Sequence, residues 1–239
     1  MSGHSKWATI HRQKEVKDSK RGAAFTKLGR AITIAVKEGG GVGDPLKNFK
    51  LRLAVEKARQ LNMPKENIAR AIDRAAGAAG DQLAETSFEG FLPGGVAVLV
   101  QALTDNRLRT TQQVREILDK GGGNLGGSGS VSYLFAQQGE IIAVPGGKNL
   151  DAAQLEIIDL GVEDVEVDEG KLVIYVPKEK TFEMQEKLEQ LGYQVESAQL
   201  VMQPTNWVSV DAQKQAKIEA ILEKLDDLDD VQKVWTNYA

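Results

Sequence analysis

The apolar residues of this chain change their spacing after residue 76, and that change limits the folds open to it. Up to residue 76 they recur every three or four residues, as on one face of a helix, whereas beyond it they alternate or form short runs, as in strands. Residues 77–81, rich in Gly and Ala, are typical of a linker between the two patterns. With 239 residues, the chain is long enough for two or three domains.

Three helices are expected in an N-terminal domain that spans residues 1–78. The first carries its apolar residues at helical spacing and ends at Gly39-Gly40-Gly41. Asp44 followed by Pro45 is typical of an N-cap and a first helical position, so we expect the second helix to begin there. Pro64 ends this helix and begins the third.

The rest of the chain is expected to form two α+β domains, one inserted into the other. Residues 138–203 predict the order strand, helix, strand, strand, helix, strand, which is the ferredoxin-like plan (βαββαβ). The segments 79–137 and 204–239 would form one discontinuous α+β domain around it. The fold class is therefore α+β and multidomain. In the discontinuous domain we expect strands at Glu85–Phe91, Val96–Thr104, Val131–Phe135 and Val231–Thr236, and helices at Thr110–Lys120 and Asp211–Leu225.

Charge is divided between the two ends of the chain. Residues 1–76 carry 17 Lys and Arg against 7 Asp and Glu, whereas residues 77–239 carry 13 against 27. The overall net charge of -4 therefore hides a basic N-terminal domain. A basic domain on an acidic body favours an encounter with a phosphate polymer, with salt-sensitive binding.

A basic, polar arm precedes the first helix and holds both histidines and one of the three tryptophans. Lys and Arg pair with phosphates, and Trp and His rings stack on unpaired bases, although Trp7 could instead pack back on the first helix. Arginines on the second and third helices are interpreted as solvated rather than base-reading. The candidate nucleic-acid-binding residues are His4, Lys6, Trp7, His11, Arg12, Lys14, Lys17, Lys20, Arg21, Lys27, Arg30 and Lys37, with Asn106, Arg107 and Asn124 as candidate loop contacts.

The residue pattern disfavours an enzyme. The chain has no cysteine, and both histidines lie in the arm, so no catalytic triad can be assembled. Residues 121–129 are glycine-rich but lack the Lys-Ser/Thr ending of a phosphate-binding P-loop, and we interpret them as a mobile helix-to-strand loop. Asp105 with Arg107 is interpreted as an ion pair at a turn.

The acidic clusters do not indicate a metal site. The four aspartates within Asp226–Asp230 match no calcium loop and are interpreted as solvated carboxylates. Glu166 and Asp168 are expected on the outer face of a strand. We expect no cofactor, no small-molecule substrate and no membrane segment, because the longest apolar run, residues 95–100, is too short to cross a bilayer.

Short motifs along the whole chain resemble the YebC/PmpR family, whose mitochondrial relative is the translational activator of cytochrome c oxidase I. The motifs are Gly3-His4-Ser5-Lys6-Trp7, Lys20-Arg21-Gly22, Phe25-Thr26-Lys27, Asn62-Met63-Pro64-Lys65-Glu66-Asn67-Ile68, Gly90-Phe91-Leu92-Pro93-Gly94-Gly95-Val96-Ala97, Thr104-Asp105-Asn106-Arg107, Gly122-Gly123-Asn124-Leu125-Gly126, Gly129-Ser130-Val131-Ser132-Tyr133-Leu134-Phe135 and Leu225-Asp226-Asp227-Leu228-Asp229-Asp230-Val231-Gln232. The resemblance implies three domains, with a ferredoxin-like domain inserted in the second.

The resemblance also implies a nucleic-acid-binding regulator of gene expression in the cytoplasm. Two descriptions of the family leave the target open: a transcriptional regulator bound to promoter DNA, or a ribosome-associated translation factor that contacts ribosomal RNA and relieves stalling at sequences such as proline runs. The chemistry of the arm favours RNA, and the family description favours DNA. A protein-interaction module that acts through the acidic domains is a third alternative.

Overall fold

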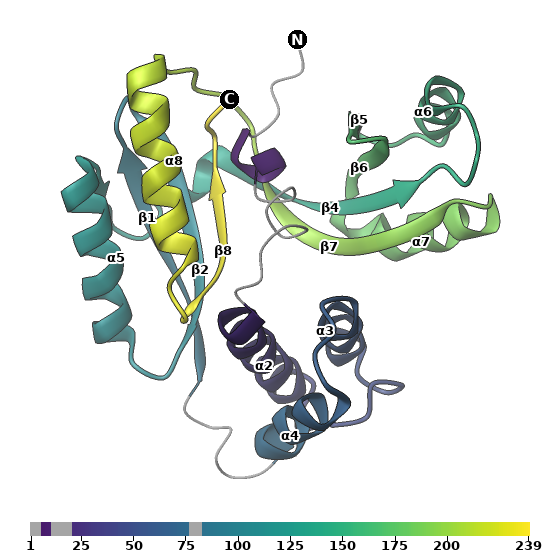
Figure 1. Cartoon of the computed structure of the whole chain (residues 1–239), viewed down its shortest axis with the longest axis horizontal. Helices are drawn as coiled ribbons and strands as arrows, with labels where there is room; N and C mark the ends of the chain where they lie inside the picture. Colours follow the sequence, from purple (N-terminus) through teal and green to yellow (C-terminus); the bar gives the residue numbers. More distant parts are fainter. Residues whose placement is uncertain (1–5, 11–20, 77–82) are drawn as a thin grey trace. The chain divides into compact units, whose positions relative to one another are not determined.

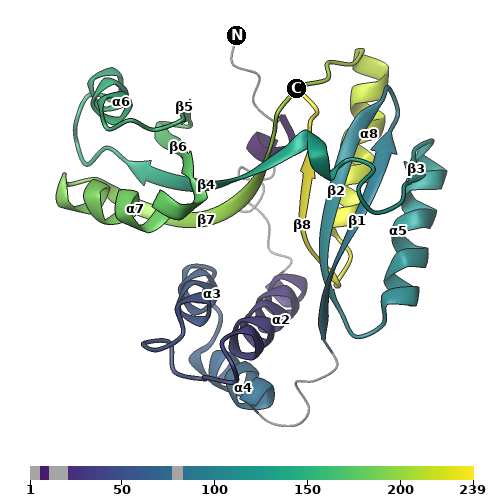
Figure 2. The same cartoon turned by 180° about the vertical axis from the view of Figure 1, so that it is seen from behind.

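The computed structural model describes residues 6–10, 21–76 and 83–239, and it divides into two units (Figures 1 and 2). Unit 1 comprises Met1–Leu134 with Asn206–Ala239, and unit 2 comprises Phe135–Thr205. The α+β multidomain class predicted from the sequence is confirmed. The division of unit 1 into two domains, with a boundary near residue 78, stays a prediction.

The helical part of unit 1 consists of α2 (Arg21–Glu38), α3 (Phe49–Gln60) and α4 (Lys65–Ala76). Their apolar faces meet in a core of their own, which includes the fully buried Ile32 and Leu51. Contacts between α2 and both other helices dominate this part, so α2 is its central element.

Asn48 caps α3, so the prediction that the second helix begins at Asp44 is wrong. The Asn48 side-chain oxygen accepts a hydrogen bond from the Leu51 N–H at 3.1 Å, while its amide nitrogen donates to the Ala35 carbonyl at 2.8 Å. Asp44 instead accepts from the Leu46 N–H in the preceding turn. Asn48 can satisfy backbone groups of α2 and α3 at once, which makes it the better cap. Its link to α2 is not visible in the local sequence.

The rest of unit 1 is a sheet covered on one face by two helices. β1 and β2 pair antiparallel over their whole length and form the predicted hairpin. α5 and α8 pack beside each other on the sheet, and the core between them includes Val98, Val114 and Leu222. The sheet order is β3-β1-β2-β8, from β1 (Ala84–Leu92), β2 (Val96–Thr104), β3 (Asn124–Leu125) and β8 (Val231–Thr236), with helices α5 (Arg107–Gly121) and α8 (Ala212–Asp226).

Unit 2 has the predicted order of elements. Its four strands pair antiparallel in the order β5-β6-β4-β7, which is the strand order of a ferredoxin-like sheet. Its core joins both helices to one face of the sheet. The elements are β4 (Phe135–Val144), α6 (Leu150–Asp159), β5 (Asp164–Asp168), β6 (Lys171–Pro177), α7 (Thr181–Gln190) and β7 (Gln194–Pro204).

Two predictions in this part of the chain are wrong. Residues expected as a strand at Val131–Phe135 form a 3₁₀ turn, η2 (Ser132–Leu134), and Phe135 begins β4 of unit 2. Glu166 is 8% exposed although it was expected on an outer face, whereas its neighbour Val167 is 43% exposed. β5 lies at an edge of a sheet whose second face also buries side chains, so alternation alone misassigns which residues are exposed.

Candidate nucleic-acid interface

Residues 6–10 form a helical segment that packs on the core of the sheet in unit 1. Trp7 is 3% exposed and belongs to the core that also contains Tyr238, and Ile10 packs against the same core. The Lys6 N–H donates to the Tyr238 carbonyl at 3.2 Å. Stacking on a base requires an exposed ring face, so the expected role of Trp7 is not available in this arrangement. The ring does pack inward, but on the far end of the chain and not on the first helix.

Several predicted site residues cannot be placed. The arm residues His4, His11, Arg12, Lys14, Lys17 and Lys20, and the side chain of Arg21, lie outside the described part of the structure. Their role in binding stays a prediction.

Lys27 of α2 reaches the C-terminal end of α8. Its ammonium group donates to the Asp226 carbonyl and lies 3.3 Å from the Asp226 carboxylate. Both side chains are largely covered, at 20% and 26% exposed. A cation at this position is favourable because the last carbonyls of a helix carry partial negative charge. Lys27 therefore has an internal anionic partner where the sequence predicted a nucleic-acid phosphate.

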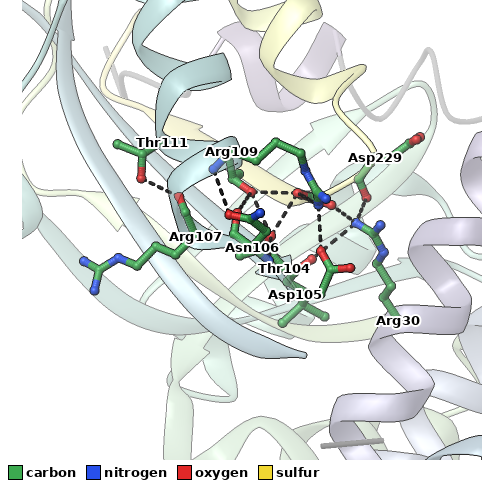
Figure 3. A network of polar contacts seen from close by, with 11 residues as sticks. Arg30, Thr104, Asp105, Asn106, Arg107, Arg109, Thr111 and Asp229 are labelled. Atoms are coloured by element: carbon green, nitrogen blue, oxygen red, sulfur yellow. Dashed lines mark hydrogen bonds and ion pairs between the residues drawn. The ribbon is translucent and has the colours of Figure 1, made fainter. Parts of the chain in front are cut away.

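Arg30, one turn further along α2, enters the turn between α8 and β8. Its guanidinium donates to the Asp229 carbonyl at 2.8 Å and to the Leu103 carbonyl at 3.3 Å, and it forms an ion pair with Asp230. Figure 3 shows Arg30 and Arg109 approaching this network from different helices. The two α2 cations thus face one acidic turn, residues 226–230, which we call the acidic turn.

Asp230 is the centre of this network, and its carboxylate is buried. One oxygen accepts from Arg109 at 2.8 Å and from the hydroxyl groups of Thr110 and Thr104 at 2.6 and 3.0 Å. Burial raises the pKa of Asp230, but the hydrogen bonds from Arg109, Thr110, Arg30 and Thr104 together lower it to about 2. The interpretation of all four aspartates as solvated carboxylates is therefore wrong for Asp230, because its partners come from elements that are distant in sequence.

The basic residues of α3 and α4 have a different environment. Lys50 forms an ion pair with Glu38 at 2.6 Å, and Lys37 is exposed at the end of α2, where it donates to the Leu83 carbonyl. Six further cations are exposed and pair with no carboxylate of the described residues: Lys47, Arg52, Arg59, Lys65, Arg70 and Arg74. We call these six the α3–α4 cations.

The three residues predicted as loop contacts lie at two places: Asn106 and Arg107 at the start of α5, and Asn124 in the edge strand β3. Asn106 is the N-cap of α5, with its side-chain oxygen accepting from the Arg109 N–H at 3.1 Å. Arg107 and Asn124 are exposed. Asp105 forms an ion pair at 2.7 Å with Arg109, one helical turn on, so its predicted partner Arg107 is wrong.

The glycine-rich loop is held by a carboxylate from within the protein. Glu89 of β1 is buried and accepts hydrogen bonds from the N–H groups of Gly129, Val131 and Ser132 at 2.8, 2.7 and 2.8 Å. Burial raises the pKa of Glu89, but these backbone donors outweigh it and lower the pKa below its usual value. The Gly129 amide, which could have met a phosphate, is therefore occupied, and this end of the loop is tied to the sheet. The mobility of residues 121–129 stays a prediction.

Glycine is required where this loop meets β1. A Cβ on Gly123 would lie 2.4 Å from the Phe91 carbonyl oxygen, and one on Gly90 would lie 2.7 Å from the Asn124 carbonyl oxygen. Such contacts are with backbone atoms, which cannot move aside cheaply. The glycines thus allow β3 to pair with β1. The sequence pattern did not predict β3.

Other kinds of site have little support in the described residues. No group of three or more His, Cys, Asp or Glu residues is placed there to hold a metal ion. None of the helices described is long and apolar enough to span a membrane.

Comparison with known proteins covers almost the whole chain. Residues 5–78 match the family model of the TACO1/YebC protein N-terminal domain, and residues 83–238 match that of the TACO1/YebC second and third domain. A "Probable transcriptional regulatory protein" of Chloroflexus aurantiacus is 49% identical over 99% of this chain and 95% of its own length. A relative of the same name from Rubrobacter xylanophilus is 45% identical over 100% of this chain and 95% of its own length.

A solved structure has the same fold. The crystal structure of a conserved hypothetical protein from Aquifex aeolicus is 42% identical, superimposes with a TM-score of 0.84, and covers 93% of this chain and 91% of its own. The resemblance inferred from the sequence motifs is thereby confirmed. The chain belongs to the TACO1/YebC family, and the relatives from Chloroflexus aurantiacus and Rubrobacter xylanophilus carry the name "Probable transcriptional regulatory protein".

Proposed function

We propose that the protein regulates gene expression by binding nucleic acid through the phosphate backbone, with the α3–α4 cations as the principal contact among the described residues. The observation that carries this proposal is a difference in ion pairing among the cations in the helical part of unit 1. Lys27 and Arg30 already have anionic partners, whereas six cations on α3, α4 and the preceding turn are exposed and pair with no carboxylate in the described part of the chain. Residues 21–76 carry 12 Lys and Arg against 5 Asp and Glu, so the domain attracts polyanions as a whole.

Duplex DNA is the target we propose. The names of the relatives favour transcription, and the stacking of Trp7, on which the preference for RNA partly rested, is not available because the ring is buried. Phosphate contacts from Arg and Lys supply affinity and little sequence discrimination. The protein would act without catalysis and in the cytoplasm, where its target lies.

Binding should be measured by fluorescence anisotropy with a labelled 30-base-pair duplex over a series of salt concentrations. The test variant replaces Arg59, Arg70 and Arg74 with Gln. The matched control replaces Lys178, Lys180 and Lys187 of unit 2, which are also exposed, so that both variants lose three positive charges. The test variant should flatten the log–log salt dependence by about 0.9 for each lost phosphate contact, and the control should leave it nearly unchanged.

A second experiment with the same two variants separates the two nucleic acids. Sedimentation of the purified full chain with ribosomes, with and without ribonuclease, reports on RNA. The proposal is supported if the test variant loses duplex binding and the control variant does not. If the test variant bound duplex as tightly as the unaltered protein at 0.15 M salt, the α3–α4 cations would not be the contact. If ribosome association were lost while duplex binding was unaffected, the function would be in translation.

A further inference from the structure

The contact between α2 and the acidic turn is polar rather than apolar. The buried apolar residues of α2 belong to the core that it shares with α3 and α4, and the core between the sheet, α5 and α8 contains none of them. Across this contact Lys27 and Arg30 donate hydrogen bonds to carbonyl and carboxylate oxygens of the acidic turn and to the Leu103 carbonyl. A joint held by charges is weakened by salt and by competing polyanions, whereas an apolar joint is not.

The acidic turn does not depend on α2 for its own integrity. Without Arg30, Asp230 would keep its hydrogen bonds from Arg109, Thr104 and Thr110, so the buried carboxylate would remain paired. The Asp230 carbonyl also accepts from the Leu103 N–H at 2.7 Å, which ties the turn to β2. Among the described residues, release of α2 from the acidic turn breaks two partly covered ion pairs and the hydrogen bonds of Arg30 to the Asp229 and Leu103 carbonyls, and it does not leave the Asp230 carboxylate alone.

The acidic turn presents the chemistry of a phosphate backbone to α2. Lys27 meets a carbonyl and a carboxylate oxygen of Asp226, and Arg30 meets the Asp229 carbonyl and the Asp230 carboxylate. Ammonium and guanidinium groups bind phosphate oxygens by the same charge-assisted hydrogen bonds. One pair of cations thus has two mutually exclusive kinds of partner.

We propose that the acidic turn is an intramolecular competitor of nucleic acid for Lys27 and Arg30, so that the helical part of unit 1 is released from the turn when a duplex binds. This inference rests on the proposed function, because it needs a polyanion that engages the α3–α4 cations first. The released α2 adds Lys27 and Arg30 to the bound surface. Binding and opening are therefore coupled, and weakening the contact raises affinity.

Opening can be measured directly because the chain has no native cysteine. Spin labels on the variant Thr26→Cys/Gln112→Cys, both exposed positions, report the separation of α2 from α5 by pulsed electron paramagnetic resonance. The free protein should give one narrow distance distribution, which saturating 30-base-pair duplex should shift to longer distances. Adding Lys27→Gln/Arg30→Gln to the labelled chain should produce the longer distances without DNA. A distribution that stays unchanged while the duplex binds would overturn the inference.

Affinity gives an independent test with a matched control in the same turn. Asp226→Asn removes the carboxylate that faces Lys27, and Asp229→Asn removes an exposed carboxylate while keeping the carbonyl that Arg30 uses. Asp226→Asn should tighten duplex binding about threefold to fivefold, and Asp229→Asn less than twofold. Equal gains would show a general charge effect and overturn the inference. Absence of duplex binding in every variant, including the unaltered chain, would instead refute the proposed function.

Discussion

Asp230 and Glu89 are two buried carboxylates of unit 1 that obtain their hydrogen bonds from different sources. Asp230 is bound by side chains from α2, α5 and the end of β2, whereas Glu89 is bound by backbone N–H groups of one loop. Side-chain donors can be exchanged for another partner, but backbone donors cannot leave without unfolding the loop. The Asp230 network is therefore suited to a contact that can open, and the Glu89 network to one that stays closed.

Removal of the Asp230 carboxylate should have the largest effect on stability. Asp230→Ala leaves Arg109 and two buried threonine hydroxyls without their common acceptor, and we expect a loss of about 3–5 kcal/mol in the free energy of unfolding. Urea denaturation measures it. The control Asp229→Ala, at an exposed position in the same turn, should change stability by less than about 0.5 kcal/mol. Equal losses would mean that the network does not hold the turn.

Substitution of Glu89 should have a smaller but more local effect. In Glu89→Gln one acceptor oxygen is replaced by an amide that faces N–H donors, so at least one of the three loop hydrogen bonds is lost, at a cost of about 1–3 kcal/mol. Amide hydrogen exchange should accelerate at Gly129, Val131 and Ser132. Glu85→Gln, on an exposed part of the same strand, serves as the control. Unchanged hydrogen exchange at these three residues would contradict the prediction that Glu89 holds the loop on the sheet.

Lowering the pH should reduce the free energy of unfolding, because the carboxylates of Asp230 and Glu89 become protonated. Because the pKa of each is lowered by folding, each contributes stability that is present above its unfolded pKa and is lost as the pH falls. For Asp230 the loss should begin near pH 4 and extend to the folded pKa of about 2, amounting to about 2 kcal/mol. Asp230→Asn should flatten the curve of stability against pH in that window. An unaltered curve in this variant would show that Asp230 is not the titrating group.

The Arg30 contact should contribute least. Arg30→Gln leaves Asp230 with three other donors, so we expect a loss of about 0.5–1 kcal/mol, measured by urea denaturation. Arg109→Gln, which removes a donor to both Asp105 and Asp230, should cost more. The reverse order would mean that α2, and not α5, supports the acidic turn, and the contact would then be a permanent joint.

Local patterns were sufficient for most elements of the fold. The hairpin at residues 84–104, the βαββαβ order of unit 2 and the strand at Val231–Thr236 follow from periodicity and turn residues, because each depends on neighbours in sequence. The predictions for the start of α3 and for Val131–Phe135 were wrong because the deciding partners are distant. Those partners are the Ala35 carbonyl for Asn48 and the Glu89 carboxylate for the loop.

The candidate site shows the same division. The arginines of α3 and α4 were interpreted as solvated because nothing in the sequence fixed a recognition helix, and in the structure they are exposed. Trp7, Lys27 and Arg30 were assigned to a ligand because the sequence offered no internal partner. Their partners lie some 200 residues away, at Tyr238, Asp226 and Asp230.

Sequence alone determined the α+β class, the family and the basic character of the N-terminal part, because composition, periodicity and motifs are properties of neighbouring residues. Tertiary structure alone decided which charges are free to bind. A cation on a helix is equally basic whether it faces water or a carboxylate, and only the packing of α2 against the acidic turn distinguishes Lys27 and Arg30 from Arg59 and Arg74.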